Sequence, residues 1–177
     1  VIVVLDEAYF EYVDHPDYPD GLSLLNEFPN LVVARTFSKV YGLAGLRAGY
    51  SVSSAALADL LNRIRPPFNV SSVAMVAAEA ALADDDHLRK TLKLNRDGMR
   101  QLTEGFHELG LAFIPSVGNF VCVEAGDAKR VNDALLRQGV IVRPVANYGM
   151  PRHLRVTVGL PEENARFLAA LRVALGT

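Results

Sequence analysis

Polar side chains that could bind a cation follow the first apolar run of the chain. Asp6 and Tyr9 come directly after Val1–Leu5, whose residues are typical of a buried strand. Ligands of open α/β sheets collect at the carboxyl ends of strands, and a desolvated carboxylate needs a cationic or donor partner. Asp6 is therefore a candidate ligand-binding residue, although a turn or helix-capping aspartate would occupy the same position.

A lysine follows the second apolar run. The segment Thr36-Phe37-Ser38-Lys39 comes directly after 31–35. A lysine whose pKa is lowered by burial or by a nearby cation becomes a nucleophile, and Schiff-base chemistry is one of its main uses. A lone lysine at a strand end is more commonly a solvated surface residue. Lys39 alone therefore leaves both interpretations open.

An arginine lies eight residues beyond this lysine, at the end of Gly42-Leu43-Ala44-Gly45-Leu46-Arg47. These glycines do not have the spacing of a phosphate-binding P-loop. The planar guanidinium of Arg47 could nevertheless bind a phosphate through two hydrogen bonds. By itself this segment is a weak indication of function.

The stretches that must position these residues predict an α/β layer over residues 1–83. Ser54 could cap a helix in which Leu57, Leu60, Leu61 and Ile64 recur at helical spacing, and Pro66 would end it. We expect a second helix at 72–83 and strands at 1–5, 31–35 and 47–52, in a mostly parallel sheet with helices.

Residues 84–177 predict a small α+β domain. Asp84, Asp127 and Pro161 could each begin a helix, and Gly110 and Gly139 would end the first two. We expect strands at 111–114, 119–124, 140–143 and 153–158. Cys122 lies within the second of these strands and is expected in the core.

Composition excludes some classes of function. The formal net charge of −2 gives no electrostatic reason to expect nucleic-acid binding, and no apolar run reaches the length of a membrane span. A single cysteine cannot form an internal disulfide, which fits a reducing compartment. The four histidines do not have metal-ligand spacing, so we expect no metal.

Because the chain opens inside an expected buried strand without an initiator Met, we infer a fragment of a longer protein.

Taken together, these motifs resemble the fold-type-I aminotransferases, which depend on pyridoxal 5′-phosphate. The resemblance covers the whole chain and is closest to the histidinol-phosphate aminotransferase family. The segments that carry it are Asp6-Glu7-Ala8-Tyr9, Arg35-Thr36-Phe37-Ser38-Lys39, Leu43-Ala44-Gly45-Leu46-Arg47-Ala48-Gly49-Tyr50, Gly118-Asn119-Phe120 and Leu154-Arg155-Val156-Thr157-Val158-Gly159. It implies that residues 1–83 are the C-terminal part of a cofactor-binding large domain, and that 84–177 are the small domain.

The resemblance also implies a role for each matching residue. Lys39 would hold the cofactor as a Schiff base and act as general base, and Asp6 would pair with the protonated pyridine nitrogen. Tyr9 would hydrogen-bond the phenolic oxygen of the ring. Arg47, Thr36 and Ser38 would hold the phosphate. The cofactor site would also need residues upstream of this chain and a tyrosine of a partner subunit, so we expect the fragment alone to bind cofactor poorly and to be inactive.

For substrates, the resemblance assigns the phosphate of histidinol phosphate, and the carboxylate of glutamate, to Arg155. Arg143 and Asn119 are further candidate substrate contacts, although Arg155 could be a solvent-facing strand residue and Asn119 could only shape a turn. The implied reaction converts histidinol phosphate and 2-oxoglutarate to imidazole acetol phosphate and glutamate, in histidine biosynthesis, in a cytoplasmic homodimer. The alternatives are an aromatic amino-acid aminotransferase, a related decarboxylase, and an aminotransferase-like ligand-binding domain of a transcription regulator.

Overall fold

The computed structural model describes residues 1–176, which form two compact units. The first is Val1–Thr91 and the second begins at Leu92. Helix α3 (Asp85–Glu108) carries the chain from one unit into the other. The domain boundary expected between residues 83 and 84 stays a prediction.

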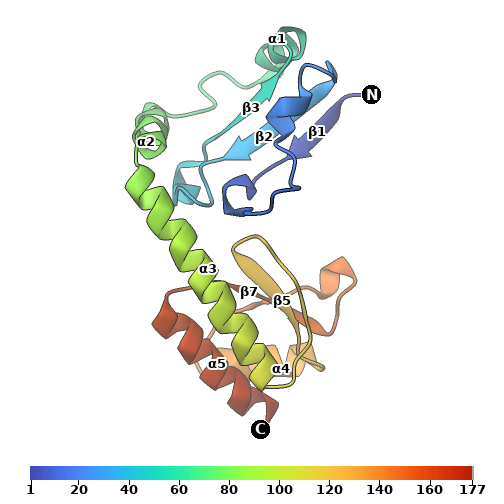
Figure 1. Cartoon of the computed structure of the whole chain (residues 1–177), viewed down its shortest axis with the longest axis vertical. Coiled ribbons are helices and arrows are strands. Elements are labelled where there is room, and N and C mark those ends of the chain that lie inside the picture. The colour runs from blue at the N-terminus through green and yellow to red at the C-terminus, as the bar shows by residue number, and fades with distance from the viewer. Residues whose placement is uncertain (177) are drawn as a thin grey trace. The chain divides into compact units, whose positions relative to one another are not determined.

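The first unit is built on a sheet in the order β1-β2-β3, drawn in blue and teal in Figure 1. Its strands are β1 (Val3–Asp6), β2 (Leu31–Thr36) and β3 (Gly49–Ser53). Strand β1 pairs with β2 in parallel, whereas β3 is antiparallel to β2. This half of the chain thus contributes a mixed sheet. The helices α1 (Ala55–Ile64) and α2 (Ser72–Leu82) follow it.

Short 3-10 helices fill the connections of this unit: η1 (Phe10–Tyr12), η2 (Gly21–Leu24) and η3 (Ala44–Leu46). The central strand is the best buried, since Leu31, Val32 and Val33 are at most 6% exposed. Strand β1 differs from the expectation of burial on both faces, because Val3 and Val4 are about half exposed. The apolar pattern of β1 therefore does not correspond to burial on both faces within residues 1–176.

The second unit packs three helices, the first of them α3, against one face of a sheet in the order β4-β5-β7-β6. Its strands are β4 (Phe113–Ile114), β5 (Phe120–Glu124), β6 (Arg143–Pro144) and β7 (His153–Thr157), and all of its pairings are antiparallel. Helices α4 (Ala128–Arg137) and α5 (Pro161–Leu175) complete it, with η4 (Ala146–Tyr148) after β6. Figure 1 shows α5 beside the C-terminal half of α3.

Fully buried side chains from α3, both central strands, α4 and α5 form the core of the second unit. They include Leu102, Phe106, Val121, Leu135, Leu154 and Leu171. Helices α3 and α5 approach closely at Gly105, where an added Cβ would lie 2.5 Å from a methyl group of Leu168. The glycine is thus a packing requirement of this contact.

Most expected helix ends are confirmed. The side chains of Asp84 and Asp127 accept hydrogen bonds from the backbone N–H groups of His87 and Arg130. Gly110 and Gly139 have φ of +66° and +70°, the left-handed conformation that ends a helix. Pro161 begins α5.

Three local expectations were wrong. The hydroxyl of Ser54 does not cap α1 but donates to the carbonyl of Pro29. The strand expected at 140–143 is displaced to Arg143–Pro144. Cys122 is not in the core, because Val121 and Val123, which alternate with it, occupy the core face and leave the thiol on the other face.

Candidate active site

A hollow of about 400 Å³ in the first unit collects most of the residues predicted to bind the cofactor. It lies at the carboxyl ends of β1 and β2, where ligands of α/β sheets gather. Its lining includes Asp6, Thr36, Ser38, Lys39 and Arg47, with Val4, Ala8, Ala34 and Arg35. Asp6 and Arg47 are 41 positions apart in the sequence. The parallel pairing of Asp6 with Ala34 brings the two strand ends together.

Tyr9 does not line the hollow but lies next to its lysine. The Lys39 ammonium nitrogen is 5.2 Å from the centre of the Tyr9 ring, within the range of a cation–π contact. Asp6 is exposed, and its Oδ1 accepts a hydrogen bond of 3.1 Å from the N–H of Ala8. The structure thus brings Asp6, Tyr9 and Lys39 into one neighbourhood.

The turn that presents Lys39 is held by Thr36 and by backbone bonds. The Thr36 hydroxyl accepts the N–H of Ser38 at 3.0 Å and lies 3.4 Å from the carbonyl of Ala48. The N–H of Leu43 reaches back to the carbonyl of Phe37 at 2.9 Å. Thr36 therefore has a positioning role in addition to the phosphate-binding role predicted for it.

His87, near the start of α3, also reaches this turn. Its Nε2 lies 3.3 Å from the carbonyl of Val40, the residue after Lys39. The contact connects the helix to the turn.

Arg47 has φ of 55° and ψ of 45°, which is unusual for a residue that carries a side chain. A left-handed arginine costs about 1–2 kcal/mol relative to the usual helical conformation. Strain of this kind clusters at functional sites. The conformation places the exposed Arg47 in the lining of the hollow, where one Nη also donates to the carbonyl of Ala44.

The charged groups of the hollow are not neutralised by one another. Within residues 1–176, Lys39 and Arg47 form no ion pair, and Asp6 pairs with neither. A carboxylate, an amine, hydroxyls and a guanidinium therefore line one hollow. Such a set suits a ligand that carries both a cationic and an anionic part.

Sequence reasoning did not single out the buried pair beneath this hollow. Glu7 is 2% exposed and accepts two hydrogen bonds from Arg35, of 2.9 and 2.8 Å. The sequence does place an acid, Glu7, directly after Asp6 and a base, Arg35, directly before Thr36. On two neighbouring strands, such residues could form an ion pair.

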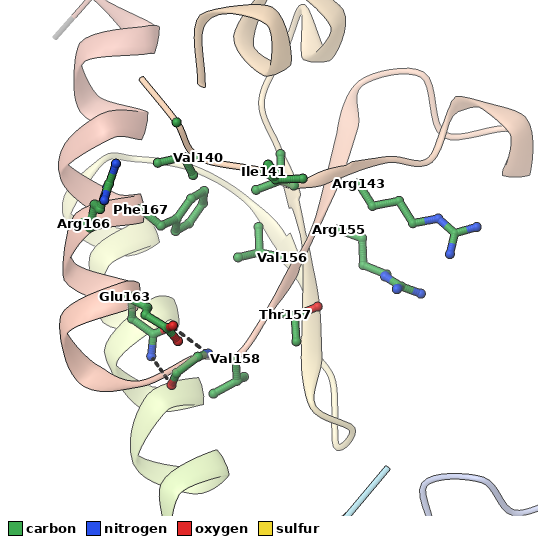
Figure 2. Close-up of a pocket in the computed structure, with 14 residues that line it drawn as sticks. Val140, Ile141, Arg143, Arg155, Val156, Thr157, Val158, Glu163, Arg166 and Phe167 are labelled. Carbon is green, nitrogen blue, oxygen red and sulfur yellow. Dashed lines mark hydrogen bonds between the residues drawn. The ribbon is translucent and has the colours of Figure 1, made fainter. Parts of the chain in front are cut away.

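The candidate substrate residues of the second unit lie on the sheet face opposite the helices. Arg143 and Arg155 are paired in register across β6 and β7, and Cys122 is the partner of Arg155 on β5. Figure 2 shows both arginine side chains extending away from Phe167 and Glu163 of α5. The 620 Å³ hollow drawn there extends to α5, and the two guanidinium groups point away from that helix.

Each arginine contacts an aromatic ring. Arg155 lies 4.7 Å from the centre of the Phe120 ring, and its Nε is buried without a hydrogen-bond partner among the described residues. Arg143 donates a 3.1 Å hydrogen bond to the hydroxyl of Tyr148. Two like charges directly opposite one another are unfavourable, so this face is suited to an anion.

Asn119 contributes through its backbone. Its carbonyl accepts the N–H of Val158 at 2.9 Å, which joins the beginning of β5 to the end of β7. The side-chain role predicted for Asn119 stays a prediction.

Burial raises the pKa of the Cys122 thiol, an effect that nearby Arg155 partly offsets. Cys122 is thus a weakly reactive thiol beside the anion-binding candidate.

Comparison with known proteins agrees with this geometry. Residues 1–171 match the family model described as aminotransferase class I and II. A histidinol-phosphate aminotransferase of Pseudomonas fluorescens is 62% identical over 99% of this chain and 48% of the relative. One of Pseudomonas aeruginosa is 63% identical over 97% of the chain and 47% of the relative. The chain thus spans about half the length of these curated relatives.

A solved structure is also similar. It is the histidinol-phosphate aminotransferase of Sinorhizobium meliloti in complex with pyridoxal 5′-phosphate. The TM-score is 0.89 at 35% sequence identity, over 99% of this chain and 49% of that one. Both units of the present chain therefore have counterparts in that structure.

Proposed function

Because the chain belongs to the aminotransferase class I and II family, we propose that it is part of a pyridoxal-phosphate-dependent aminotransferase that acts on histidinol phosphate. The observation that carries the proposal is the hollow in which Asp6, Lys39 and Arg47 lie together without being paired. The relatives named histidinol-phosphate aminotransferase support the choice of substrate. Transfer of an amino group to 2-oxoglutarate would complete the reaction.

The residues of the hollow fit the cofactor group by group. Lys39 supplies the amine that attaches to an aldehyde, and Asp6 supplies the carboxylate that stabilises a protonated ring nitrogen. Arg47 and Ser38 supply donors for a phosphate. When bound, pyridoxal phosphate withdraws electrons from the α-carbon of an amino substrate.

Lys39 has a second task once a substrate amine displaces it. Its free Nζ would then be the base that takes the proton from the amine-bearing carbon of the substrate and gives it to the former aldehyde carbon of the cofactor, the 1,3-proton shift that transamination requires. Tyr9, whose ring lies beside the lysine, would hold the amine in place and donate its hydroxyl proton to the ring oxygen of the cofactor. The turn fixed by Thr36 limits the movement of Lys39 between these tasks.

We assign recognition of the substrate anion to Arg143 and Arg155. A phosphate dianion accepts hydrogen bonds from two guanidinium groups, and it would offset their mutual repulsion. The unpartnered Nε of Arg155 is a donor that such an anion could satisfy. The α-carboxylate of glutamate would use the same residues in the other half-reaction.

The upstream cofactor residues and the partner-subunit tyrosine that the resemblance implies lie outside this chain. We therefore propose that the active form is a longer, homodimeric and cytoplasmic protein, and that the present chain alone is inactive. No helix among residues 1–176 is long and apolar enough to cross a membrane.

Substrate profiling of the full-length protein tests the proposal. Transamination of 2-oxoglutarate should be much faster with histidinol phosphate than with phenylalanine, because only the former carries a phosphate. Arg155→Gln should lower kcat/KM for histidinol phosphate, and also kcat/KM for 2-oxoglutarate, because the carboxylate is assigned to the same residue. Indifference of the full-length protein to histidinol phosphate would refute the assigned substrate, and absence of any transamination would refute the reaction.

A further inference from the structure

A buried ion pair joins the two strands that present Asp6 and Lys39. Glu7 directly follows Asp6, and its side chain is 1% exposed. Its Oε2 accepts from Nε and Nη2 of Arg35, and its Oε1 accepts the N–H of Gly21 at 2.8 Å. The carboxylate is thus satisfied by three hydrogen bonds inside the unit.

Arg35 is held on further sides. Its side chain is 9% exposed, its Nη2 lies 2.6 Å from an oxygen of Asp20, and its guanidinium stacks 3.7 Å from the centre of the Phe10 ring. Burial acts to lower the pKa of Arg35, but hydrogen bonds to Glu7 and Tyr50 and the nearby carboxylates outweigh burial and raise it. A planar guanidinium with this many contacts has little freedom to move.

The backbone at Gly21 also lies close to the Glu7 carboxylate, on the side away from Arg35. A Cβ added to Gly21 would lie 2.6 Å from Glu7 Oε1 and 2.6 Å from a methyl group of Leu5. The Glu7 carboxylate is therefore confined between Gly21 of η2 and Arg35 of β2. Strand β1 is weakly buried, so this confinement adds a side-chain restraint to the backbone pairing with β2, in which the N–H of Glu7 donates to the carbonyl of Ala34 at 2.9 Å.

We propose that Glu7 and Arg35 are positioning residues, whose ion pair fixes the end of β1 that presents Asp6 against the part of β2 that leads to Lys39. The inference rests on the proposed function, because it concerns how the same hollow is shaped. Arg35 is among the residues that line the hollow, but its guanidinium is engaged by Glu7, Asp20 and Phe10, so neither residue is assigned a contact with the cofactor. Their effect would pass through the backbone of Asp6 and through Thr36, which fixes the turn before Lys39.

The physics of buried ion pairs separates this role from a purely structural one. Arg35→Met leaves the buried Glu7 carboxylate without a cationic partner, which is strongly destabilising, whereas Glu7→Gln leaves Arg35 paired only with the more exposed Asp20. Removing both also removes that penalty, so the double variant regains much of its stability. The defined geometry, however, is lost in all three variants. Stability and cofactor affinity should therefore respond differently to the second substitution.

The experiment compares Glu7→Gln, Arg35→Met and the double variant in the full-length protein. The dissociation constant of pyridoxal phosphate is measured by absorbance, well below the thermal midpoint of each apoprotein. We expect each single variant to lower the midpoint and to weaken binding at least tenfold. The double variant should recover most of the midpoint while its affinity stays at least tenfold weaker. Recovery of both together, or affinities within twofold of wild type, would overturn the inference.

Two further variants keep the test interpretable. Arg35→Lys preserves the charge but cannot donate two hydrogen bonds from a planar group, so it should still lose affinity severalfold. Unchanged affinity in this variant would count against the inference. Asp59→Asn breaks an exposed ion pair with Arg63 in the same unit and should leave affinity unchanged. An equal loss there would show a general effect of charge and overturn the specific role.

Covalent trapping of the cofactor distinguishes failure of the proposed function from failure of the positioning role. Reduction of wild type with borohydride should attach the cofactor covalently to Lys39. If wild type gives no such product, the proposed function fails and the positioning role falls with it. If wild type gives the product and the single variants bind as tightly, only the positioning role is refuted.

Discussion

Arg143 and Arg155 stand directly opposite one another on β6 and β7, and both point away from the helical layer. Neither guanidinium forms an ion pair within residues 1–176. Arg143 instead donates a hydrogen bond to the hydroxyl of Tyr148. Like charges at opposed positions of an antiparallel pair oppose folding. An anion bound between them, as proposed above, would offset this cost.

Inorganic phosphate should therefore stabilise the chain through this pair. A ligand present at tenfold its dissociation constant stabilises the folded state by about 1.4 kcal/mol. We expect phosphate to raise the thermal midpoint of wild type, and to raise that of Arg143→Gln much less. Arg137→Gln, which removes an exposed arginine from α4, serves as the control. An equal response in Arg143→Gln and wild type would contradict this account of the pair.

Replacing Arg47 by glycine should separate strain from cofactor binding. Glycine adopts the left-handed conformation without strain, so Arg47→Gly should keep the free energy of unfolding or raise it by up to about 1 kcal/mol. The same change removes the guanidinium that we propose holds the phosphate, so cofactor affinity of the full-length protein should fall at least tenfold.

Phe68→Gly is the matched control for that experiment. Phe68 has φ of 53° and is 96% exposed, and it lies outside the hollow. This variant should show the gain in stability without the loss of affinity. A similar loss of affinity in both variants would mean that Arg47 acts through loop conformation and does not hold the phosphate.

The motif residues were predictable from sequence because their types and their places after strands are local properties. Asp6 and Lys39 lie after β1 and β2, where strand-end reasoning places them, and Arg47, which precedes β3, lines the same hollow. The Glu7–Arg35 pair was not predicted because it depends on the register of two strands and on the loop that carries Gly21. The face of Cys122 was ambiguous because Phe120 and Cys122 are as apolar as Val121 and Val123, so alternation alone gave two possible core faces.

The stability contribution of Glu11 should depend on pH. Burial raises the pKa of the Glu11 carboxyl, against its backbone hydrogen bond and the charge of Arg35, which act to lower it. A raised folded pKa favours folding below the ordinary value of 4.5, and this contribution is lost as the pH rises through the folded pKa.

Glu11→Gln should accordingly be more stable than wild type at neutral pH, and this advantage should shrink as the pH falls below 4.5. Urea unfolding at neutral pH and below pH 4.5 measures the difference in the free energy of unfolding between Glu11→Gln and wild type. Glu27→Gln, at an exposed position of the same unit, controls for the change in net charge. A destabilised Glu11→Gln at neutral pH would show that the interaction with Arg35 outweighs burial.

The central claim is that Lys39 carries the cofactor, and covalent trapping tests it most directly. The full-length protein is incubated with pyridoxal phosphate, reduced with borohydride, digested and analysed by mass spectrometry. We predict one phosphopyridoxyl group on the peptide that contains Lys39, and none on that peptide when Lys39→Ala is treated in the same way. The other lysines of this chain, Lys90, Lys93 and Lys129, provide internal controls. Labelling of one of these in preference to Lys39, or no label at all on the wild-type protein, would contradict the account.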